Sequence, residues 1–336
     1  MRRHVVLLTY GEPPTPNFLA QLRYSWRILL GLTRSVAPIP AALLPVIAVM
    51  RARARWQLWT TEHYGSPLEP ITREQARGVA AALAQQAPGI DWQVHVAYEF
   101  RDPLLLDCVG RIPASEPVDI VPMYVADSAF THEIARATLR RWTGRVGEAR
   151  AARVRVMPAL DGETFAELSA RYVSRELDAR GIGGPQWGLV LAAHGTLLEP
   201  KRPIETGRVA TERVCEGIAR RLAPRFGRSQ IGWLNHVYGG RWTEPPADEA
   251  LKRLVEAGCR HIVYYPFGFS ADNAESMLEG RMALRTQPGI ESVHLPCLNA
   301  DAGLAAAIAA QVVGASGLAT QTPAPQWREP VATATA

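Results

Sequence analysis

A histidine and a glutamate stand where an α/β chain could bring them together. His194 ends the apolar run 188–193, and Glu275 follows the β-rich run 262–265 and a polar turn. A short apolar run is typical of a buried parallel strand, and ligands of open α/β sheets bind at the carboxyl ends of strands. An imidazole is a base near neutral pH and a metal ligand, and a carboxylate takes a proton or holds a metal. The pair therefore predicts proton-transfer or metal chemistry.

Both side chains also have an ordinary structural interpretation. His194 is equally suited to be a core histidine whose ring bonds a carbonyl. Asp272 and Glu275 have the spacing of a capping box opened by Asp, at the start of a helix expected over residues 274–285. Glu279, four residues after Glu275, would lie on the same face of that helix, either as part of an acidic track for a metal or as a solvated side chain. We keep both interpretations of each residue at this point.

Strands alternate with helices along the whole chain, which predicts two doubly wound, Rossmann-like α/β domains with parallel sheets. The expected strands cover residues 4–9, 92–98, 118–125, 152–157, 188–194, 230–236, 261–266 and 292–296. The expected helices cover residues 17–30, 51–61, 72–86, 132–142, 164–179, 206–222, 247–257, 274–285 and 302–313. Thr72 and Gln75 have capping-box spacing and would open the helix at 72–86.

The domain boundaries follow from this alternation. We expect a first domain over residues 1–158, joined by the helix at 300–314, and a second domain over 159–299 that carries the two candidate side chains. Residues 315–336 are rich in Ala, Thr and Pro, which predicts a disordered tail.

Residues 35–50 are apolar and contain Pro38, Pro40 and Pro45. This segment is too short to span a membrane comfortably. We expect an apolar loop or broken helix, which either lines the entrance of a hydrophobic ligand or simply packs.

Charge and motif content exclude several classes of function. The chain has 336 residues with a formal net charge of +5, and its densest basic cluster is short: Arg51, Arg53 and Arg55. A nucleic-acid-binding protein usually carries a longer basic stripe, whereas a modest positive balance suits an anionic small molecule. No GxGxxG or GxxxxGK[ST] motif follows an expected strand, which argues against a dinucleotide or P-loop site.

Cysteine usage and the chain start indicate a cytoplasmic protein. The four cysteines show no CxxC spacing, so they predict reduced core thiols rather than a zinc or iron–sulfur site: Cys108, Cys215, Cys259 and Cys297. The apolar run at residues 5–8 is too short for the hydrophobic region of a signal peptide.

Five motifs, in the right order, resemble those of the ferrochelatases, which insert ferrous iron into porphyrins. Ala193-His194-Gly195 resembles the family segment with the catalytic histidine, and residues 267–275 resemble the segment with the catalytic glutamate. The other three are Ser66-Pro67-Leu68 followed by Thr72 and Gln75, Pro122-Met123-Tyr124, and Tyr10-Gly11-Glu12-Pro13, which resembles the Tyr-Gly-Thr-Pro of coproporphyrin-type enzymes. The resemblance covers about residues 5–313.

The resemblance implies roles for individual side chains. His194 and Glu275 would be catalytic and, with Glu279, would contact the metal. Tyr10 would approach the macrocycle from the face opposite His194, and Tyr124 would lie near the porphyrin, although an ordinary buried tyrosine suits it equally.

Two further side chains are candidates for binding the porphyrin carboxylates. Arg27 is one, because arginine pairs bidentately with a carboxylate, and Ser66 is the other. The alternatives are a solvated helix face for Arg27 and a plain turn serine for Ser66.

The resemblance also implies partners. The porphyrin would be coproporphyrin III or protoporphyrin IX, Fe²⁺ would be a substrate, and neither a tightly bound cofactor nor an iron–sulfur cluster is expected. We expect no nucleic acid and at most peripheral membrane contact.

Several positions depart from the family pattern. Asn273 replaces the usual histidine, Glu99 stands where many members have arginine, Ala283 replaces an acid, and residues 196–206 lack Gly-Asp-Pro-Tyr. A non-catalytic tetrapyrrole-binding protein, or a chelatase for another metal or tetrapyrrole, therefore stays an alternative.

Overall fold

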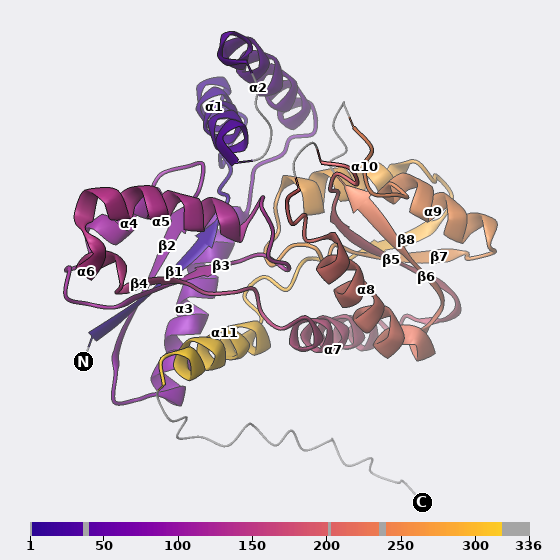
Figure 1. The fold of residues 1–336 in the computed structure, drawn as a ribbon. Coiled ribbons are helices and arrows are strands. Elements are labelled where there is room, and N and C mark those ends of the chain that lie inside the picture. Colours follow the sequence, from indigo (N-terminus) through magenta and orange to yellow (C-terminus); the bar gives the residue numbers. More distant parts are fainter. Residues whose placement is uncertain (1, 36–39, 201–202, 235–239, 318–336) are drawn as a thin grey trace, which may run out of the picture.

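Two four-stranded parallel sheets form the frame of the molecule in a computed structural model that describes residues 2–35, 40–200, 203–234 and 240–317 (Figure 1). The first sheet has the order β2-β1-β3-β4, with β1 (Arg2–Thr9), β2 (Asp91–Tyr98), β3 (Val118–Pro122) and β4 (Val154–Val156). The second has the order β6-β5-β7-β8, with β5 (Gly184–His194), β6 (Phe226–Leu234), β7 (His261–Tyr265) and β8 (Glu291–His294). The predicted α/β class with parallel sheets is confirmed.

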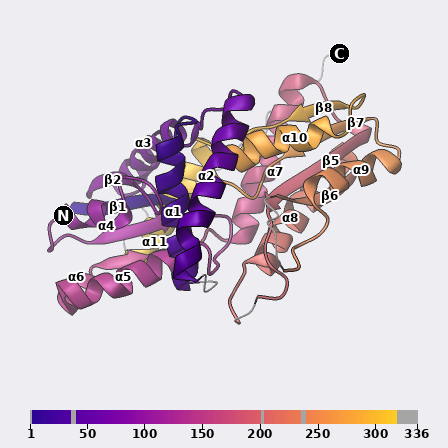
Figure 2. The same cartoon turned by 90° about the horizontal axis from the view of Figure 1, so that it is seen from above.

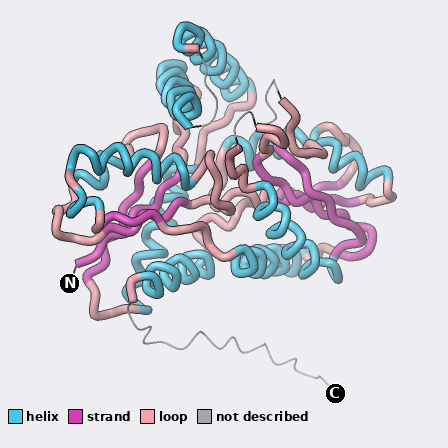
Figure 3. The backbone as a smooth tube through the Cα atoms, in the orientation of Figure 1, coloured by secondary structure: helices cyan, strands magenta, loops and turns pink. Residues whose placement is uncertain are grey.

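Helices connect the parallel strands, as crossover connections require (Figure 3). The α-helices of the described residues are α1 (Phe18–Ser35), α2 (Leu44–Thr61), α3 (Leu68–Gln86), α4 (Leu105–Gly110), α5 (His132–Val146), α6 (Glu148–Ala151), α7 (Gly162–Arg180), α8 (Arg208–Leu222), α9 (Ala247–Glu256), α10 (Gly280–Arg285) and α11 (Ala302–Ala315). A π-helix, η3 (Ala274–Glu279), leads directly into α10. The predicted helix at 274–285 is therefore a π-helix that continues as an α-helix.

Both faces of each sheet are covered, so the buried middle of each central strand is apolar, over Val5–Leu8 of β1 and Leu189–Ala193 of β5. On β5, Leu189 and Leu191 pack into the cluster that holds α7, α8 and α11, whereas Val190 and Ala192 pack into the cluster with α9. The side chains of β1 also alternate between two clusters, one with α3 on one face of the sheet and one with α4 and α5 on the other face. Alternating side chains on opposite faces of a fully buried strand explain why these runs lack the polar alternation of a half-exposed strand.

The C-terminal helix α11 lies against α3, beside the first sheet (Figure 1). The Gln86 side chain donates a hydrogen bond to the carbonyl of Ala306 at 3.0 Å, and a Cβ on Gly78 would lie 3.3 Å from the Ala305 Cβ. The assignment of residues 300–314 to the first domain stays a prediction, and the predicted tail lies mostly outside the described residues.

The capping box predicted at Thr72 and Gln75 is wrong. Helix α3 begins one turn earlier, at Leu68, and the Thr72 hydroxyl donates to the Leu68 carbonyl at 2.6 Å. The buried Gln75 amide reaches the second half of the chain, where it donates to the carbonyls of Ser270 and Asn299, each at 2.9 Å. Gln75 thus connects segments that are distant in sequence, and neither Thr72 nor Gln75 starts the helix.

Helices α1 and α2 pack side by side (Figure 2) and stand away from both sheets (Figure 1). The segment 35–50, predicted as an apolar loop or broken helix, lies partly outside the described residues; from Leu44 onward it is helical, with Pro45 in the first turn. Proline is tolerated there because the first helical amides have no intrahelical acceptor. Among the described residues, no helix is both long enough and apolar enough to cross a bilayer.

Candidate active site

His194 and Glu275 meet at the carboxyl end of β5. His194 is the last residue of that strand, and its Nδ1 lies 2.6 Å from Oε2 of Glu275. The histidine side chain is 46% exposed and the glutamate 17% exposed, so the imidazole remains open to a ligand while the carboxylate lies behind it. The structure therefore brings together the two side chains that the strand ends predicted.

A close turn after β7 carries the chain across the end of β5. The Gly268 amide donates to the Ala192 carbonyl at 3.0 Å. A Cβ at Gly268 would lie only 2.5 Å from the Ala193 Cα, so a larger residue would push the turn away from the strand. This close approach is what brings η3, and Glu275 within it, to His194.

The start of η3 is capped by Asn273, not by Asp272. The Asn273 side chain accepts hydrogen bonds from the amides of Glu275 at 2.9 Å and Ser276 at 3.2 Å, and the Ser276 hydroxyl accepts from the Asn273 amide at 2.9 Å. Asp272 instead accepts from the Cys297 amide at 2.8 Å. The predicted Asp272–Glu275 capping box is wrong, and the Glu275 carboxylate faces His194.

The electrostatics of the pair favour a protonated imidazole. Burial opposes the imidazolium, but the negative charge of Glu275, its hydrogen bond and the charge of Glu279 outweigh burial and raise the pKa of His194. An imidazole with a raised pKa is a stronger base. Glu279 thus acts on the site from the same π-helix, and π-helical turns are frequent at functional sites.

Tyr10, immediately after β1, lies in the electrostatic field of the same site. Burial and the charges of Glu12, Tyr24 and Glu275 hold the pKa of Tyr10 well above its usual range. Its phenol is consequently neutral at physiological pH in the absence of a metal. The charge of Glu275 thus acts on Tyr10, whose contact with a substrate stays a prediction.

Glu12 is a central residue that sequence reasoning did not select. Its side chain is 1% exposed, and its Oε1 accepts hydrogen bonds from the Ser66 hydroxyl at 2.5 Å and the Ala274 amide at 3.0 Å. Its Oε2 lies 3.4 Å from Nη2 of Arg55. The feature of the sequence that could have pointed to Glu12 is an acidic residue directly after a buried strand, in the segment Tyr10-Gly11-Glu12-Pro13.

The other predicted substrate-binding residues already have protein partners. Ser66 is 8% exposed and donates to Glu12. Arg27 on α1 donates to both carboxylate oxygens of Asp102, at 3.1 and 3.3 Å. Their roles toward a porphyrin stay predictions.

Tyr124 follows β3 and donates to Oε2 of Glu99 at 3.0 Å. Burial raises the pKa of Glu99 to about 8, against the opposing effect of this hydrogen bond. The predicted role of Tyr124 near the porphyrin also stays a prediction.

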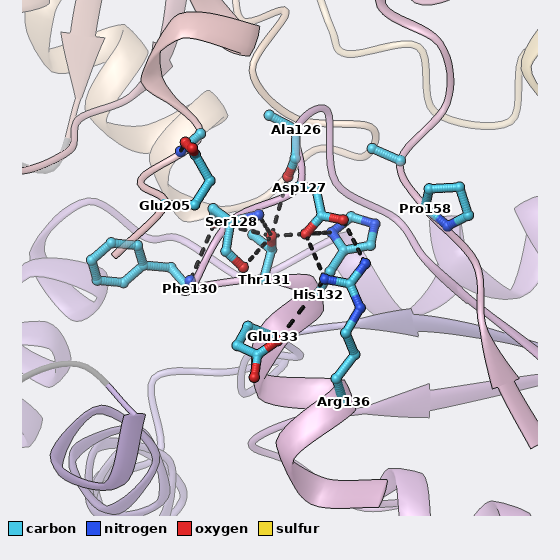
Figure 4. Close-up of polar contacts among 12 residues, drawn as sticks. Ala126, Asp127, Ser128, Phe130, Thr131, His132, Glu133, Arg136, Pro158 and Glu205 are labelled. Carbon is cyan, nitrogen blue, oxygen red and sulfur yellow. Dashed lines mark hydrogen bonds and ion pairs between the residues drawn. The ribbon is translucent and has the colours of Figure 1, made fainter. Parts of the chain in front are cut away.

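The loop after Tyr124 is fixed by its own polar contacts (Figure 4). Asp127 forms a two-point ion pair with Arg136 of α5, at 3.1 and 2.6 Å, and the Thr131 hydroxyl donates to the Ala126 carbonyl at 3.1 Å. The Ala129 amide donates to the Glu205 carbonyl at 2.8 Å. The loop thus connects the first sheet to the segment that follows His194.

The site offers one nitrogen and one oxygen donor in direct contact. Across residues 2–35, 40–200, 203–234 and 240–317, no three His, Cys, Asp or Glu side chains are grouped closely enough to hold a metal ion. The imidazole of His194 and the carboxylate of Glu275 suit transient contact with a divalent ion. The arrangement combines a base, its carboxylate partner and an open coordinating atom.

Comparison with known proteins identifies relatives along nearly the whole chain. The family model described as Ferrochelatase matches residues 2–315. A ferrochelatase of Stenotrophomonas maltophilia is 28% identical over 324 residues, covering 91% of this chain and 95% of that protein. A ferrochelatase of Synechococcus sp. (strain RCC307) is 26% identical over 320 residues, covering 91% of this chain and 80% of that protein.

Two solved structures share the fold. CbiX, described as the terminal enzyme for biosynthesis of siroheme in denitrifying bacteria, aligns with a TM-score of 0.52 and 16% identity over 93% of this chain and 99% of its own. DR2241 from Deinococcus radiodurans, described as structurally similar to chelatases, aligns with a TM-score of 0.50 and 18% identity over 93% of this chain and 54% of its own. At these identities the likeness concerns the fold alone.

Proposed function

The chain belongs to the ferrochelatase family, and we propose that it inserts Fe²⁺ into a porphyrin at the His194–Glu275 pair. The contact of 2.6 Å between Nδ1 and Oε2 carries this proposal. It places a base and a carboxylate together at the end of a strand, in the position where α/β sheets bind their ligands.

Metal insertion requires that two pyrrole N–H protons leave the macrocycle while the metal ion loses its water. The Nδ1–H of neutral His194 donates to Glu275, which directs the lone pair of Nε2 away from the carboxylate and toward a substrate. Nε2 accepts the two pyrrole protons in turn and passes each to solvent from the half-exposed imidazole, while the adjacent carboxylate stabilises the imidazolium that forms each time. A positioned base of this kind contributes about 10²–10⁴-fold to a rate.

The proposal also covers which porphyrin is the substrate and how the metal reaches the site. Tyr10 would contact the macrocycle from the face opposite His194, which favours coproporphyrin III over protoporphyrin IX. Fe²⁺ enters as a substrate, so the proposal requires no resident cofactor. The described cysteines are free thiols and take no part in it.

Anaerobic incubation with Fe²⁺ and either coproporphyrin III or protoporphyrin IX, followed by absorbance, tests the proposal. We expect turnover by the wild type, and loss of at least about 10²-fold in turnover by His194→Ala with porphyrin binding retained. Wild-type binding without turnover would contradict the proposal and favour a tetrapyrrole-binding role. Turnover only with another metal or tetrapyrrole would indicate a different chelatase.

A further inference from the structure

The π-helix η3 depends on outside contacts for its shape. It has only 6 residues, and helices this short are marginal in water without tertiary packing. A π-helical turn is also rare in proteins. The position of Glu275, which lies inside this turn, is therefore set by the groups that pack against η3.

The C-terminal end of α2 packs on η3. Trp59 and Tyr64 form one apolar cluster with Ala274 and Leu278, and all four side chains are buried. The rings of Trp59 and Tyr64 meet edge to face, with their centroids 4.7 Å apart and their planes at 82°. Ala274 and Leu278 stand on either side of Glu275 in the chain. The cluster thus fixes the backbone on both sides of that carboxylate.

Polar contacts hold the same segments together. The Tyr64 hydroxyl lies 3.5 Å from Oε1 of Glu12, the oxygen that also accepts the Ala274 amide at 3.0 Å. At the end of α10, Arg285 donates to both carboxylate oxygens of Glu62, each at 2.9 Å. The C-terminal end of α2 is therefore attached to the start of η3 and to the end of α10.

Helix α1, which lies beside α2 (Figure 2), is attached to the chain that follows β2. The Tyr24 ring of α1 packs edge to face on Phe100, with centroids 6.5 Å apart. Arg27 donates to the Asp102 carboxylate at 3.1 Å. The two helices thus connect the carboxyl end of the first sheet to the π-helix beside the second sheet.

We propose that Tyr64, supported by Trp59, is a positioning residue for Glu275 and holds η3 so that the carboxylate stays on Nδ1 of His194. This inference rests on the proposed function, because it gives Tyr64 a role in the same reaction. The Tyr64 ring fills the space between Trp59 and η3, and its removal would leave a cavity into which η3 can shift. A displacement of about 1 Å is enough to cost about 10²-fold in rate.

A double-mutant cycle tests this role in the full-length protein, with anaerobic insertion of Fe²⁺ into coproporphyrin III as the assay. Tyr64→Ala should lower kcat by about 10- to 10²-fold in the wild-type background. In the Glu275→Gln background the same substitution should lower kcat less than about twofold, because the carboxylate that Tyr64 positions is already absent. Equal fold losses in both backgrounds would overturn the inference, since a general loss of structure acts with or without the carboxylate.

Further variants separate positioning from stability. Tyr64→Phe keeps the packed ring and should stay near the wild-type kcat. Phe226→Ala removes a ring of matching burial, 7% exposed against 6% for Tyr64, at the end of β6 remote from His194. It should lower the melting temperature while kcat is kept, and a loss of kcat equal to that of Tyr64→Ala would overturn the inference.

A milder substitution covers the case in which Tyr64→Ala does not fold. Tyr64→Leu keeps much of the apolar volume but loses the edge-to-face contact with Trp59, so it replaces Tyr64→Ala in the cycle. We expect the same pattern, with a loss of kcat that disappears in the Glu275→Gln background.

The protonation of His194 reports the position of Glu275 without any turnover. In protein with isotope-labelled histidine, the NMR signal of His194 is the one absent from His194→Ala, and it is followed over pH. Because Glu275 raises the pKa of His194, Tyr64→Ala should lower that pKa toward its value in Glu275→Gln, whereas Phe226→Ala should leave it unchanged.

The outcomes distinguish this inference from the proposed function. An unchanged pKa of His194 in Tyr64→Ala would overturn the role of Tyr64 even if the wild type inserts iron. A lowered pKa in this variant, in a protein whose wild type binds porphyrin without inserting iron, would overturn the proposed function and support the positioning of Glu275 by Tyr64.

Discussion

The carboxylate of Glu12 accepts a hydrogen bond from the backbone amide of Ala274 at 3.0 Å, so the end of β1 fixes the first residue of the π-helix that carries Glu275. The two residues are far apart in sequence and belong to segments beside different sheets. Burial raises the pKa of Glu12, against the effects of Arg55, the Ser66 hydrogen bond and the Ala274 amide. Glu12 thus links the π-helix that carries Glu275 to Arg55 of α2.

Glu12→Gln should lower both stability and turnover. The amide keeps one oxygen for Ala274 or Ser66 but turns a donor toward Arg55, which leaves a buried cation without its acid. We expect a loss of about 1–3 kcal/mol in the free energy of unfolding, measured in urea, and a lower kcat. A free energy of unfolding within about 0.5 kcal/mol of the wild-type value is typical of a neutral surface substitution. That result would show that Glu12 is dispensable for stability.

The pH dependence of kcat/KM should report the His194–Glu275 pair. The active form has a neutral imidazole, so activity falls as pH drops through the pKa of His194. Because Glu275 and Glu279 raise that pKa, the acidic limb of the wild type should lie above about pH 6.5, the ordinary histidine value.

Glu275→Gln tests the cause of this shift. The substitution removes the larger opposing charge, so burial lowers the pKa and the acidic limb should move to lower pH while turnover falls. The Glu275 side chain takes no part in the capping box, which uses Asn273 and Ser276, so the variant should remain folded. An unchanged pH profile would mean that the carboxylate does not control the imidazole.

The meeting of His194 and Glu275 could be predicted because it follows from topology. Each residue comes after a run that forms a buried parallel strand, and β5 and β7 are neighbours in one sheet. The carboxyl ends of parallel neighbours lie at one edge, so side chains that follow them share that edge. No distant contact had to be known to reach this conclusion.

Local spacing failed where a tertiary contact competed for the same side chain. Asp272 and Glu275 fit a capping box, but Asn273 with Ser276 fits one as well, and Asp272 is used by the Asn299 side chain at 2.7 Å. Glu12 could not be recognised as an inter-element link either, because its donors Arg55, Ser66 and Ala274 are all distant in sequence. Such choices depend on which polar groups the fold brings together, and sequence spacing does not encode them.

Tyr10→Phe should change the visible spectrum of the protein with bound iron coproporphyrin III. The phenol stays neutral without a metal, because burial and nearby negative charge raise its pKa, but a ferric ion at its oxygen would favour the phenolate. Removing the hydroxyl removes that ligand, whereas iron insertion should be less affected, because we propose that His194 and Glu275 carry the proton transfer.

Tyr172→Phe, a substitution on α7 in the core, is the matched control and should leave the spectrum of the ferric product unchanged. A spectral change in Tyr10→Phe alone would place the phenol at the metal. If the wild type also binds iron coproporphyrin III more tightly than iron protoporphyrin IX, the substrate with more carboxylates is favoured. Identical spectra for wild type and Tyr10→Phe would remove Tyr10 from the metal.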